Sequence, residues 1–203
     1  MKNYSALIAL AVMFISSTSF AQSSDGGLFL EPSVIYEQGK GEIDFKSVAQ
    51  PDGDLKGWGL GLRFGGHVSD ILFLAIDTTY SKPEFTDENG DFDYDLKSWL
   101  AGVTLGAQTP VAGLRVWGSY IPLGEITLDG RDANDTNIKY KKPQMWKVGA
   151  GFRVSMVSIN LEYLSGKYDT LEVKNAGTLL SGDYSGDAKR DSWLASVSFP
   201  LSL

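Results

Sequence analysis

The chain has 203 residues, of which 43% are hydrophobic and 21% charged, with 18 basic groups, 25 acidic groups and no cysteine. The net charge of -7 argues against a nucleic-acid partner, because phosphate contacts need a surplus of Lys and Arg, and the lack of cysteine excludes disulfides, thiolate metal sites and cysteine nucleophiles. The mean hydropathy of -0.09 is by itself typical of a soluble domain. In addition, no apolar run after residue 22 approaches the roughly 18 residues of a membrane-spanning helix.

The first residues carry the pattern of an export signal. Lys2 precedes the uninterrupted apolar stretch 6–15, and mostly small or polar residues then lead to Ser19-Phe20-Ala21. This order is typical of a secretory signal peptide with an A-x-A-like cleavage site. A retained membrane anchor is the alternative, but the apolar stretch is too short for one. We therefore expect residues 1–21 to be cleaved and residues 22–203 to form the exported domain.

The rest of the chain alternates large apolar residues with small or polar ones at a period of two. In 57–65, for example, Trp58, Leu60, Leu62 and Phe64 alternate with four glycines and an arginine. This period predicts β-strands with one apolar face. The segments that show it are 28–36, 57–65, 71–80, 98–106, 114–120, 146–154, 159–164 and 192–203.

The connections between these segments alternate in length. Short turns are expected near 67–70, 108–113 and 155–158, and long polar loops near 39–56, 82–95, 121–143 and 165–191. An even number of strands with alternating short turns and long loops is typical of bacterial outer-membrane barrels. We predict an all-β fold, an eight-stranded antiparallel up-and-down transmembrane β-barrel. A soluble barrel with its apolar face inside, or a sandwich, is the alternative, because alternation alone does not say which face is internal.

Aromatic residues favour the membrane barrel. Trp and Tyr gather where strands meet the long loops, which is where amphipathic rings form a girdle at a membrane interface. The opposite face is rich in glycine and charge, as a narrow lumen requires. The predicted girdle consists of Tyr36, Trp58, Tyr80, Trp99, Tyr120, Trp146 and Trp193.

In this arrangement the sequence resembles the small eight-stranded outer-membrane barrels of the OmpA and OmpX type, in architecture rather than in a shared motif. The resemblance implies a place in the cell outer membrane of a Gram-negative bacterium, in contact with outer-membrane lipid and lipopolysaccharide. Nothing in the sequence suggests an oligomer, so we expect a monomer. The resemblance also implies that the barrel-assembly machinery reads the C-terminal strand. Family members usually end in an aromatic residue, whereas Trp193-x-Ala195-x-Val197-x-Phe199 is followed here by a terminus at Leu203. Either Phe199 or Leu203 then serves as the recognition residue.

Charged residues on the inner face are the first candidate site. We expect carboxylates and cations in a narrow lumen to pair, because unpaired buried charge is costly. A structural network that fills the barrel is the simpler interpretation, since eight strands leave little room inside, and a narrow or gated ion pathway is the alternative. The predicted lumen residues are Glu31, Arg63, Asp77, Arg115, Lys147, Arg153 and Glu162.

A catalytic site has one candidate motif. The chain's single histidine lies in His67-Val68-Ser69, which is similar to the His-x-Ser of the lipid A deacylases, but Asp70 stands where those enzymes have Asn. A polar turn accounts for the same residues. We therefore expect no catalytic residues and no cofactor.

The second long loop contains a cluster of carboxylates that is a weak candidate for Ca²⁺ or Mg²⁺ binding. An EF-hand pattern beginning at Asp87 would place Ser98 where a bidentate Glu is needed, so a solvated acidic loop with no metal is the simpler interpretation. Lys139, Lys141 and Lys142 at the base of the third loop are candidates to meet lipopolysaccharide phosphates. The candidate cation ligands are Asp87, Glu88, Asp91, Asp93 and Asp95.

Together these patterns favour a non-catalytic integral outer-membrane barrel with a structural or surface-interaction role through its long extracellular loops. A small, porin-like channel for ions or apolar solutes, similar to the OmpW type, is the alternative, and it requires an open lumen or a lateral gap. A lipid A-modifying hydrolase is a lesser alternative.

Overall fold

The computed structural model describes residues 27–43, 52–87, 93–109, 113–129, 136–175, 182–184 and 188–203. Among these residues no helix has the length and apolar character needed to cross a membrane. The strands are β1 (Leu28–Ile43), β2 (Asp52–His67), β3 (Leu72–Asp87), β4 (Asp93–Gln108), β5 (Leu114–Asp129), β6 (Thr136–Val154), β7 (Val157–Asn175), β8 (Gly182–Tyr184), β9 (Ala188–Ser198) and β10 (Leu201–Ser202).

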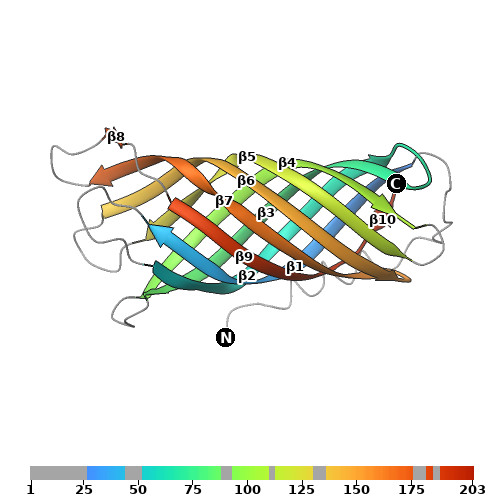
Figure 1. Ribbon diagram of the computed structural model, residues 1–203, viewed down its shortest axis with the longest axis horizontal. Helices are drawn as coiled ribbons and strands as arrows, with labels where there is room; N and C mark the ends of the chain where they lie inside the picture. Colours follow the sequence, from blue (N-terminus) through green and yellow to red (C-terminus); the bar gives the residue numbers. More distant parts are fainter. Residues whose placement is uncertain are drawn as a thin grey trace, which may run out of the picture.

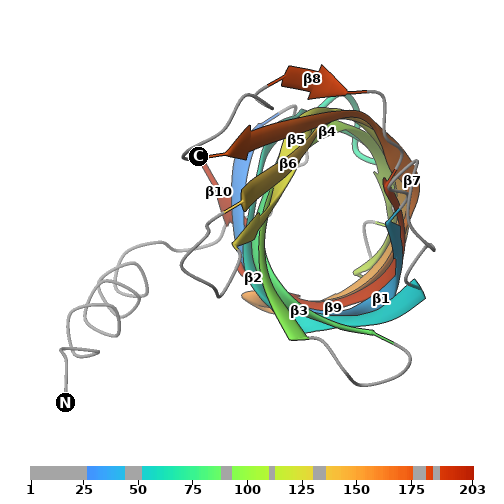
Figure 2. The same cartoon turned by 90° about the vertical axis from the view of Figure 1, so that its left-hand side faces the viewer.

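The sheet closes on itself. Strands β1 to β7 pair antiparallel in sequence order, and β9 pairs with both β7 and β1, so that eight strands form a barrel (Figures 1 and 2). The short β8 pairs with β7, and β10 resumes the pairing with β1 after Pro200. The predicted fold class, an eight-stranded antiparallel barrel, is confirmed.

Burial alternates along the strands as the sequence predicts. On β2 the outward side chains Trp58 and Leu60 are 65% and 58% exposed, whereas Arg63 between outward Leu62 and Phe64 is buried. Large apolar side chains are exposed in the same way on every barrel strand. An apolar outer wall is the arrangement of a membrane barrel, and it is the reverse of a soluble ligand-carrying barrel.

The strands are longer than the sequence predicts at the end opposite the short turns. Most are 16 residues long and β6 and β7 have 19, whereas about 10 residues cross a bilayer. The long loops expected at 39–56, 82–95, 121–143 and 165–191 are therefore largely strand, and that prediction was wrong. Pairing between β1 and β2 continues to Glu42 and Asp52. The backbone hydrogen bonds between strands continue beyond the apolar outer wall, so a change to polar side chains on the outer face does not end these strands.

Irregularities in β5, β6 and β7 re-aim their side chains. The β4–β5 register shifts between Ala101 and Val103, Lys142 has a φ of 56°, and Gly124 and Gly166 each have a φ of 152°. Bulges of this kind change which residues face inward. On β5 the buried positions accordingly change from odd numbers, ending at Ile121, to even numbers, beginning at Ile126.

Candidate functional site

The interior of the barrel has two halves of different chemistry. The short-turn half lies next to the turns that join β2 to β3, β4 to β5 and β6 to β7, and it contains buried charged residues. The other half, which we call the long-connection half after the long loops that the sequence predicts at that end, has buried side chains that are mostly apolar. Together the two halves determine whether anything passes through the lumen.

The short-turn half holds six charged side chains from six strands, which we call the charged network. Three are carboxylates and three are cations, so their formal charges cancel, and all six are buried. Its members are Glu31 of β1, Arg63 of β2, Asp77 of β3, Arg115 of β5, Lys147 of β6 and Glu162 of β7.

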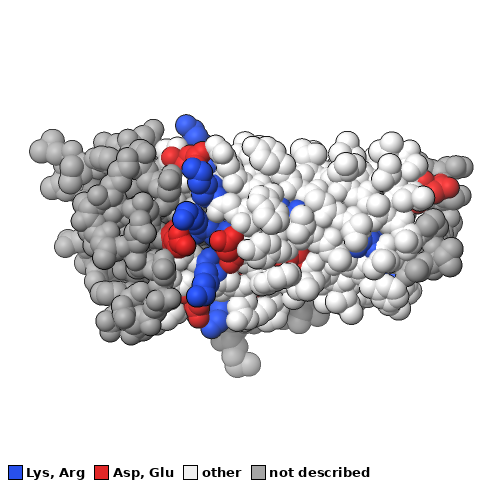
Figure 3. Space-filling view, viewed as in Figure 1, with Lys and Arg blue, Asp and Glu red and all other residues white. Residues whose placement is uncertain are grey.

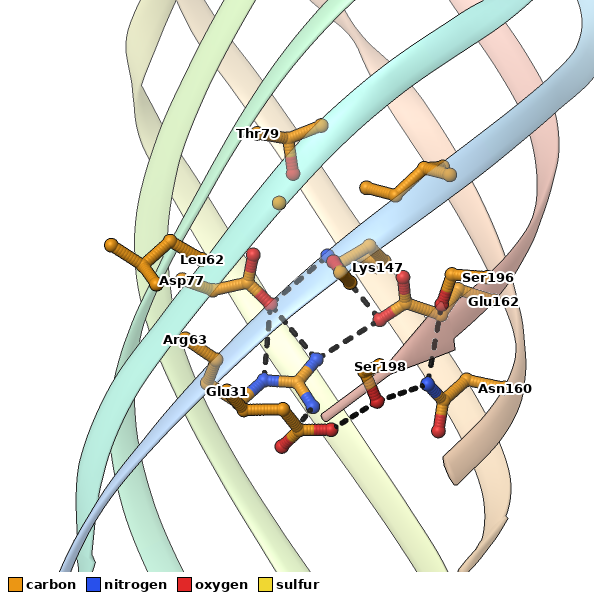
Figure 4. A pocket seen from close by; sticks show the side chains of 13 residues that line it. Glu31, Leu62, Arg63, Asp77, Thr79, Lys147, Asn160, Glu162, Ser196 and Ser198 are labelled. Carbon is orange, nitrogen blue, oxygen red and sulfur yellow. Dashed lines mark hydrogen bonds and ion pairs between the residues drawn. The ribbon is translucent and has the colours of Figure 1, made fainter. Parts of the chain in front are cut away.

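The centre of the charged network is a four-residue ring of ion pairs (Figure 4). Arg63 Nη2 donates to Asp77 Oδ2 at 2.9 Å and to Glu162 Oε1 at 3.2 Å. Lys147 Nζ donates to the same Asp77 oxygen at 3.0 Å and lies 3.3 Å from Glu162 Oε1. Each cation bridges both carboxylates, so substituting any one of the four by a neutral residue would deprive its partners of a counter-charge.

A second part of the charged network surrounds Glu31. Arg115 donates to both carboxylate oxygens of Glu31, at 2.9 and 2.8 Å, and Ser198 Oγ adds a hydrogen bond of 2.6 Å. Arg63 Nη1 lies 3.7 Å from the same carboxylate, which links the two parts. The bidentate Arg–carboxylate geometry and the extra hydroxyl satisfy a group that would otherwise be costly to bury.

Trp117 contacts the charged network, and this contact was not predicted from the sequence. Its Nε1 donates to Glu162 Oε1 at 2.6 Å, and the Arg63 guanidinium lies 4.7 Å from its ring centre. A Cβ on Gly149 would lie 2.5 Å from this indole, so the neighbouring strand must have glycine there. The inward position of Trp117 follows from the alternation of β5, but its partner lies 45 residues away and has no local signal.

The short-turn end of the lumen is covered by aromatic rings. His67 lies 5.3 Å from the ring of Phe29 and 6.3 Å from that of Phe73. Ser69 Oγ accepts a hydrogen bond from the backbone N–H of Leu72 at 3.1 Å. The His67-Val68-Ser69 motif thus supplies a packing residue and a turn residue.

The structure places Arg153 apart from the other predicted lumen residues. It lies near the β6–β7 turn, only partly buried, and its Nε donates to the carbonyl oxygen of Ser155 at 3.1 Å. Six of the seven predicted lumen residues therefore come together in one network, and Arg153 stands at its edge.

The long-connection half is filled by a cluster of buried apolar side chains, which we call the apolar plug. Tyr140, Tyr168 and Phe85 are its largest members, each at most 1% exposed. Much of the plug comes from segments that the sequence analysis assigned to loops. Its members are Ile35, Leu55, Phe85, Leu96, Leu100, Ile121, Ile126, Leu128, Tyr140, Met145, Leu164, Tyr168, Ala188 and Leu194.

One ion pair is buried beside the apolar plug. Arg190 Nε and Nη2 donate to the two carboxylate oxygens of Glu37, at 2.8 and 2.5 Å, and Nη1 donates to Ser98 Oγ at 2.8 Å. The Oγ of Ser81 accepts a further hydrogen bond at 3.4 Å. The pair was not predicted from the sequence, because Glu37 lies just beyond the first predicted strand and Arg190 lies within a predicted loop.

Each half contains a small cavity lined by described residues. A cavity of about 20 Å³ lies in the charged network, and another of about 20 Å³ lies within the apolar plug. A cavity of this size holds about one water molecule. The described side chains therefore fill the lumen at two successive levels.

The aromatic girdle is a ring with one member on every barrel strand. All seven predicted residues lie on the outer face, and Tyr163 of β7 completes the ring. Its ring lies 5.6 Å from that of Trp146 and 5.0 Å from that of Trp193. The alternation of 159–164 contains this signal, although Tyr163 is not among the predicted girdle residues.

The candidate cation ligands are only partly within the described residues. Glu88 and Asp91 lie outside them, Asp87 and Asp93 are the end residues of β3 and β4, and Asp95 is exposed on β4 opposite Asp129. Within the described part of the chain, no group of three metal-ligating side chains comes together. The cation site thus stays a prediction.

The predicted signal peptide also lies outside the described residues, and cleavage after residue 21 stays a prediction.

The fold is similar to those of small outer-membrane barrels of known structure. Neisserial surface protein A is 14% identical with a TM-score of 0.50, and the match covers 86% of this chain and 98% of that protein. For Ail, the attachment invasion locus protein of Yersinia pestis, the values are 12%, 0.53, 86% and 99%. For OprG from Pseudomonas aeruginosa they are 11%, 0.50, 91% and 100%. No protein-family model and no curated protein sequence matches the chain.

Proposed function

We propose that this protein is a closed, non-catalytic barrel of the bacterial outer membrane that acts through the end carrying the long connections. The observation that carries the proposal is the double closure of the lumen. A charged network in which each carboxylate has two or more polar partners fills one level, and the apolar plug fills the next. A filled interior leaves the surface of the barrel as the part that meets other molecules.

Extension of the strands beyond the apolar band supports a role at that end. Strands of 16 to 19 residues exceed the length that crosses a bilayer, so the barrel projects well past the girdle. The projecting wall is held from inside by the apolar plug, which gives the long connections a rigid base. A structural or surface-interaction role uses such a base directly.

The experiment that tests closure is conductance of the refolded protein in a planar bilayer. We expect no discrete openings at a potential of either sign, with a general porin in the same bilayer as the positive control. Reproducible unitary openings would contradict the proposal and favour a narrow ion channel.

A second candidate function, passage of small apolar solutes, is favoured by one observation, the apolar lining of the long-connection half. Such a solute would need to leave through the barrel wall, because the charged network closes the lumen toward the short turns. Uptake of an apolar dye into vesicles separates the two functions. Equal uptake by vesicles with and without the protein supports the closed barrel, and faster uptake with the protein supports the channel.

We also propose that the protein is not an enzyme. The contacts of His67 are with Phe29 and Phe73, and the hydroxyl of Ser69 is engaged with the backbone of its own turn. A nucleophile needs an adjacent base instead. Mass spectrometry of lipid A from cells that overproduce the protein is expected to show no change. A product that disappears in His67→Ala would establish a hydrolase.

We also propose that the barrel-assembly machinery recognises the C-terminal strand. Phe199 directly follows β9 and Leu203 directly follows β10, close to the edge where the barrel closes on β1. Phe199 donates its backbone N–H to Pro32 and Leu203 donates to Leu28, both at 2.9 Å. We expect Phe199→Ala or Leu203→Ala to lower the amount of folded protein in the outer-membrane fraction, and the larger loss identifies the recognition residue.

A further inference from the structure

A belt of lysines surrounds the barrel just beyond the aromatic girdle. Figure 3 shows it as a band of basic side chains, with acidic ones between them, at the edge of the uncharged wall. Seven of the eight barrel strands contribute an exposed lysine to this lysine belt. Its members are Lys40 of β1, Lys56 of β2, Lys82 of β3, Lys97 of β4, Lys142 of β6, Lys167 of β7 and Lys189 of β9.

The lysine belt lies at a definite level. Lys82 is the cross-strand partner of Trp58, so a belt residue and a girdle residue stand next to each other on the same face. Girdle rings mark the headgroup level of a bilayer. Side chains that point outward from the wall at this level face lipid headgroups, whereas a soluble polyanion would approach the rim of the barrel.

Like charges lie close together in the lysine belt. Lys167 and Lys189 are direct cross-strand partners. Lys82 and Lys97 are the outward neighbours of Ser81 and Ser98, which are themselves cross-strand partners, so these lysines also lie side by side. Like charges in such positions destabilise a sheet unless a counter-charge relieves them. Asp169 and Glu42 lie 3.1 Å from Lys167 and 2.8 Å from Lys189. The exposed cross-strand pair Glu84 and Asp95 stands next to Lys82 and Lys97 on the same face.

A groove lies below the pair Lys82 and Lys97. Its volume is about 290 Å³, near the lower limit of small-molecule sites. The depression forms because Thr78 is short and its partner on β4 is Ala101. The outward side chains that line it are Leu60, Leu62, Thr78, Tyr80 and Trp99.

We propose that Lys82, Lys97 and this groove form a binding site for one phosphorylated, acylated lipid of the outer leaflet. The two ammonium groups meet a phosphate at the headgroup level, because lysine is an effective point-charge partner for phosphate. One acyl chain of the same molecule lies in the groove beneath them. The rest of the lysine belt attracts the same lipids less specifically, and the proposal does not depend on whether the lumen conducts.

Native mass spectrometry of the refolded, full-length mature barrel in detergent tests the proposal. The probes are diphosphoryl lipid A and the same lipid with its phosphates removed. We expect one adduct with the diphosphoryl form at about tenfold lower lipid concentration than with the dephosphorylated form, since each basic residue near an anionic lipid contributes several-fold in affinity. Equal binding of the two forms would overturn the proposal.

Two variants with the same loss of charge locate the site. Lys82→Gln/Lys97→Gln is expected to lose about tenfold or more in affinity, whereas Lys40→Gln/Lys142→Gln, on strands away from the groove, retains most of it. Equal losses in both would reduce the site to a diffuse charged surface and overturn it. Resistance of the unheated gel band to unfolding confirms that each variant has folded.

The groove and the alternative ligand have separate tests. Thr78→Leu fills the depression without changing the charge, and we expect weaker adducts with intact lysines. Unchanged binding by this variant would refute the acyl-chain part of the proposal. A sulfated oligosaccharide serves as a soluble polyanion, and full displacement of the lipid by it at equal concentration would assign the lysines to a soluble partner instead.

Discussion

The two halves of the lumen are closed by opposite means. The short-turn half depends on six buried charges held in one network, and the long-connection half depends on apolar packing around the buried Arg190–Glu37 pair. Both leave about the same small cavity, so volume alone does not distinguish them. They differ in what a substitution leaves behind, which is an unbalanced charge in one half and a void in the other.

This difference follows from what surrounds each half. Beside the bilayer, the outer wall must be apolar, and the alternation of the strands leaves polar residues for the interior. Beyond the girdle, lysines and carboxylates occupy the outer face, and the interior can hold a conventional hydrophobic core. The barrel is thus a membrane protein in one half and resembles a small soluble barrel in the other.

The largest expected effect comes from removing the cation shared by the charged network. Arg63→Met leaves the buried carboxylates Asp77, Glu162 and Glu31 with fewer counter-charges, which costs about 3–5 kcal/mol. Urea unfolding in vesicles, followed by tryptophan fluorescence, measures the loss. Arg153→Met, at the partly exposed edge, is the control and should cost less than about 1 kcal/mol. Similar values for the two variants would mean that water already screens the network.

A void in the apolar plug should cost somewhat less and leave the lumen closed. Phe85→Ala removes a fully buried ring, with an expected loss of about 3 kcal/mol in the free energy of unfolding. The charged network is untouched, so bilayer conductance stays at baseline. The appearance of ion conduction in this variant would show that the plug alone closes the barrel, and that the network beneath it is permeable.

The buried pair Arg190–Glu37 tests whether charge is needed in the apolar half. Arg190→Met alone leaves Glu37 as an unpaired buried charge and is expected to lower the free energy of unfolding by about 3 kcal/mol. Arg190→Met/Glu37→Met replaces both side chains by apolar ones, and its free energy of unfolding is expected to lie within about 1 kcal/mol of the parent value. A matched double variant in the other half, Arg115→Met/Glu31→Met, is expected not to recover. Glu31 also accepts a hydrogen bond from Ser198 and lies near Arg63, so the double variant removes the acceptor of the Ser198 hydroxyl and one of the three carboxylates around Arg63. Equal recovery in both halves would remove the distinction between them.

The same comparison explains how far the sequence predicts this molecule. Between the turns and the girdle, lipid on one side enforces strict alternation, and Glu31, Arg63, Asp77, Arg115, Lys147 and Glu162 could all be placed inside from their position in the pattern. Pairing partners such as Trp117 and Glu162 were not predictable, because the closure of eight strands brings them together. Past the girdle, outer side chains become polar, and the contrast that reveals a strand disappears. Bulges near Gly124, Lys142 and Gly166 also break the period of two. For the same reason, most of the apolar plug and the pair Arg190–Glu37 could not be predicted from the sequence.

The smallest expected effect separates neutral from charge-assisted hydrogen bonds in the two halves. Ser119 and Thr104 share a buried hydroxyl contact of 2.7 Å in the short-turn half, and Ser98 accepts from Arg190 at 2.8 Å in the other. Ser119→Ala is expected to cost about 1 kcal/mol, and Ser98→Ala about 2 kcal/mol, because a bond to a charged group is stronger and its loss leaves a buried guanidinium N–H without a partner. Paired urea titrations measure both values. If Ser98→Ala proved the milder change, the Arg190 guanidinium would be satisfied by Glu37 alone, and the long-connection half would depend on apolar packing more completely than its hydrogen bonds indicate.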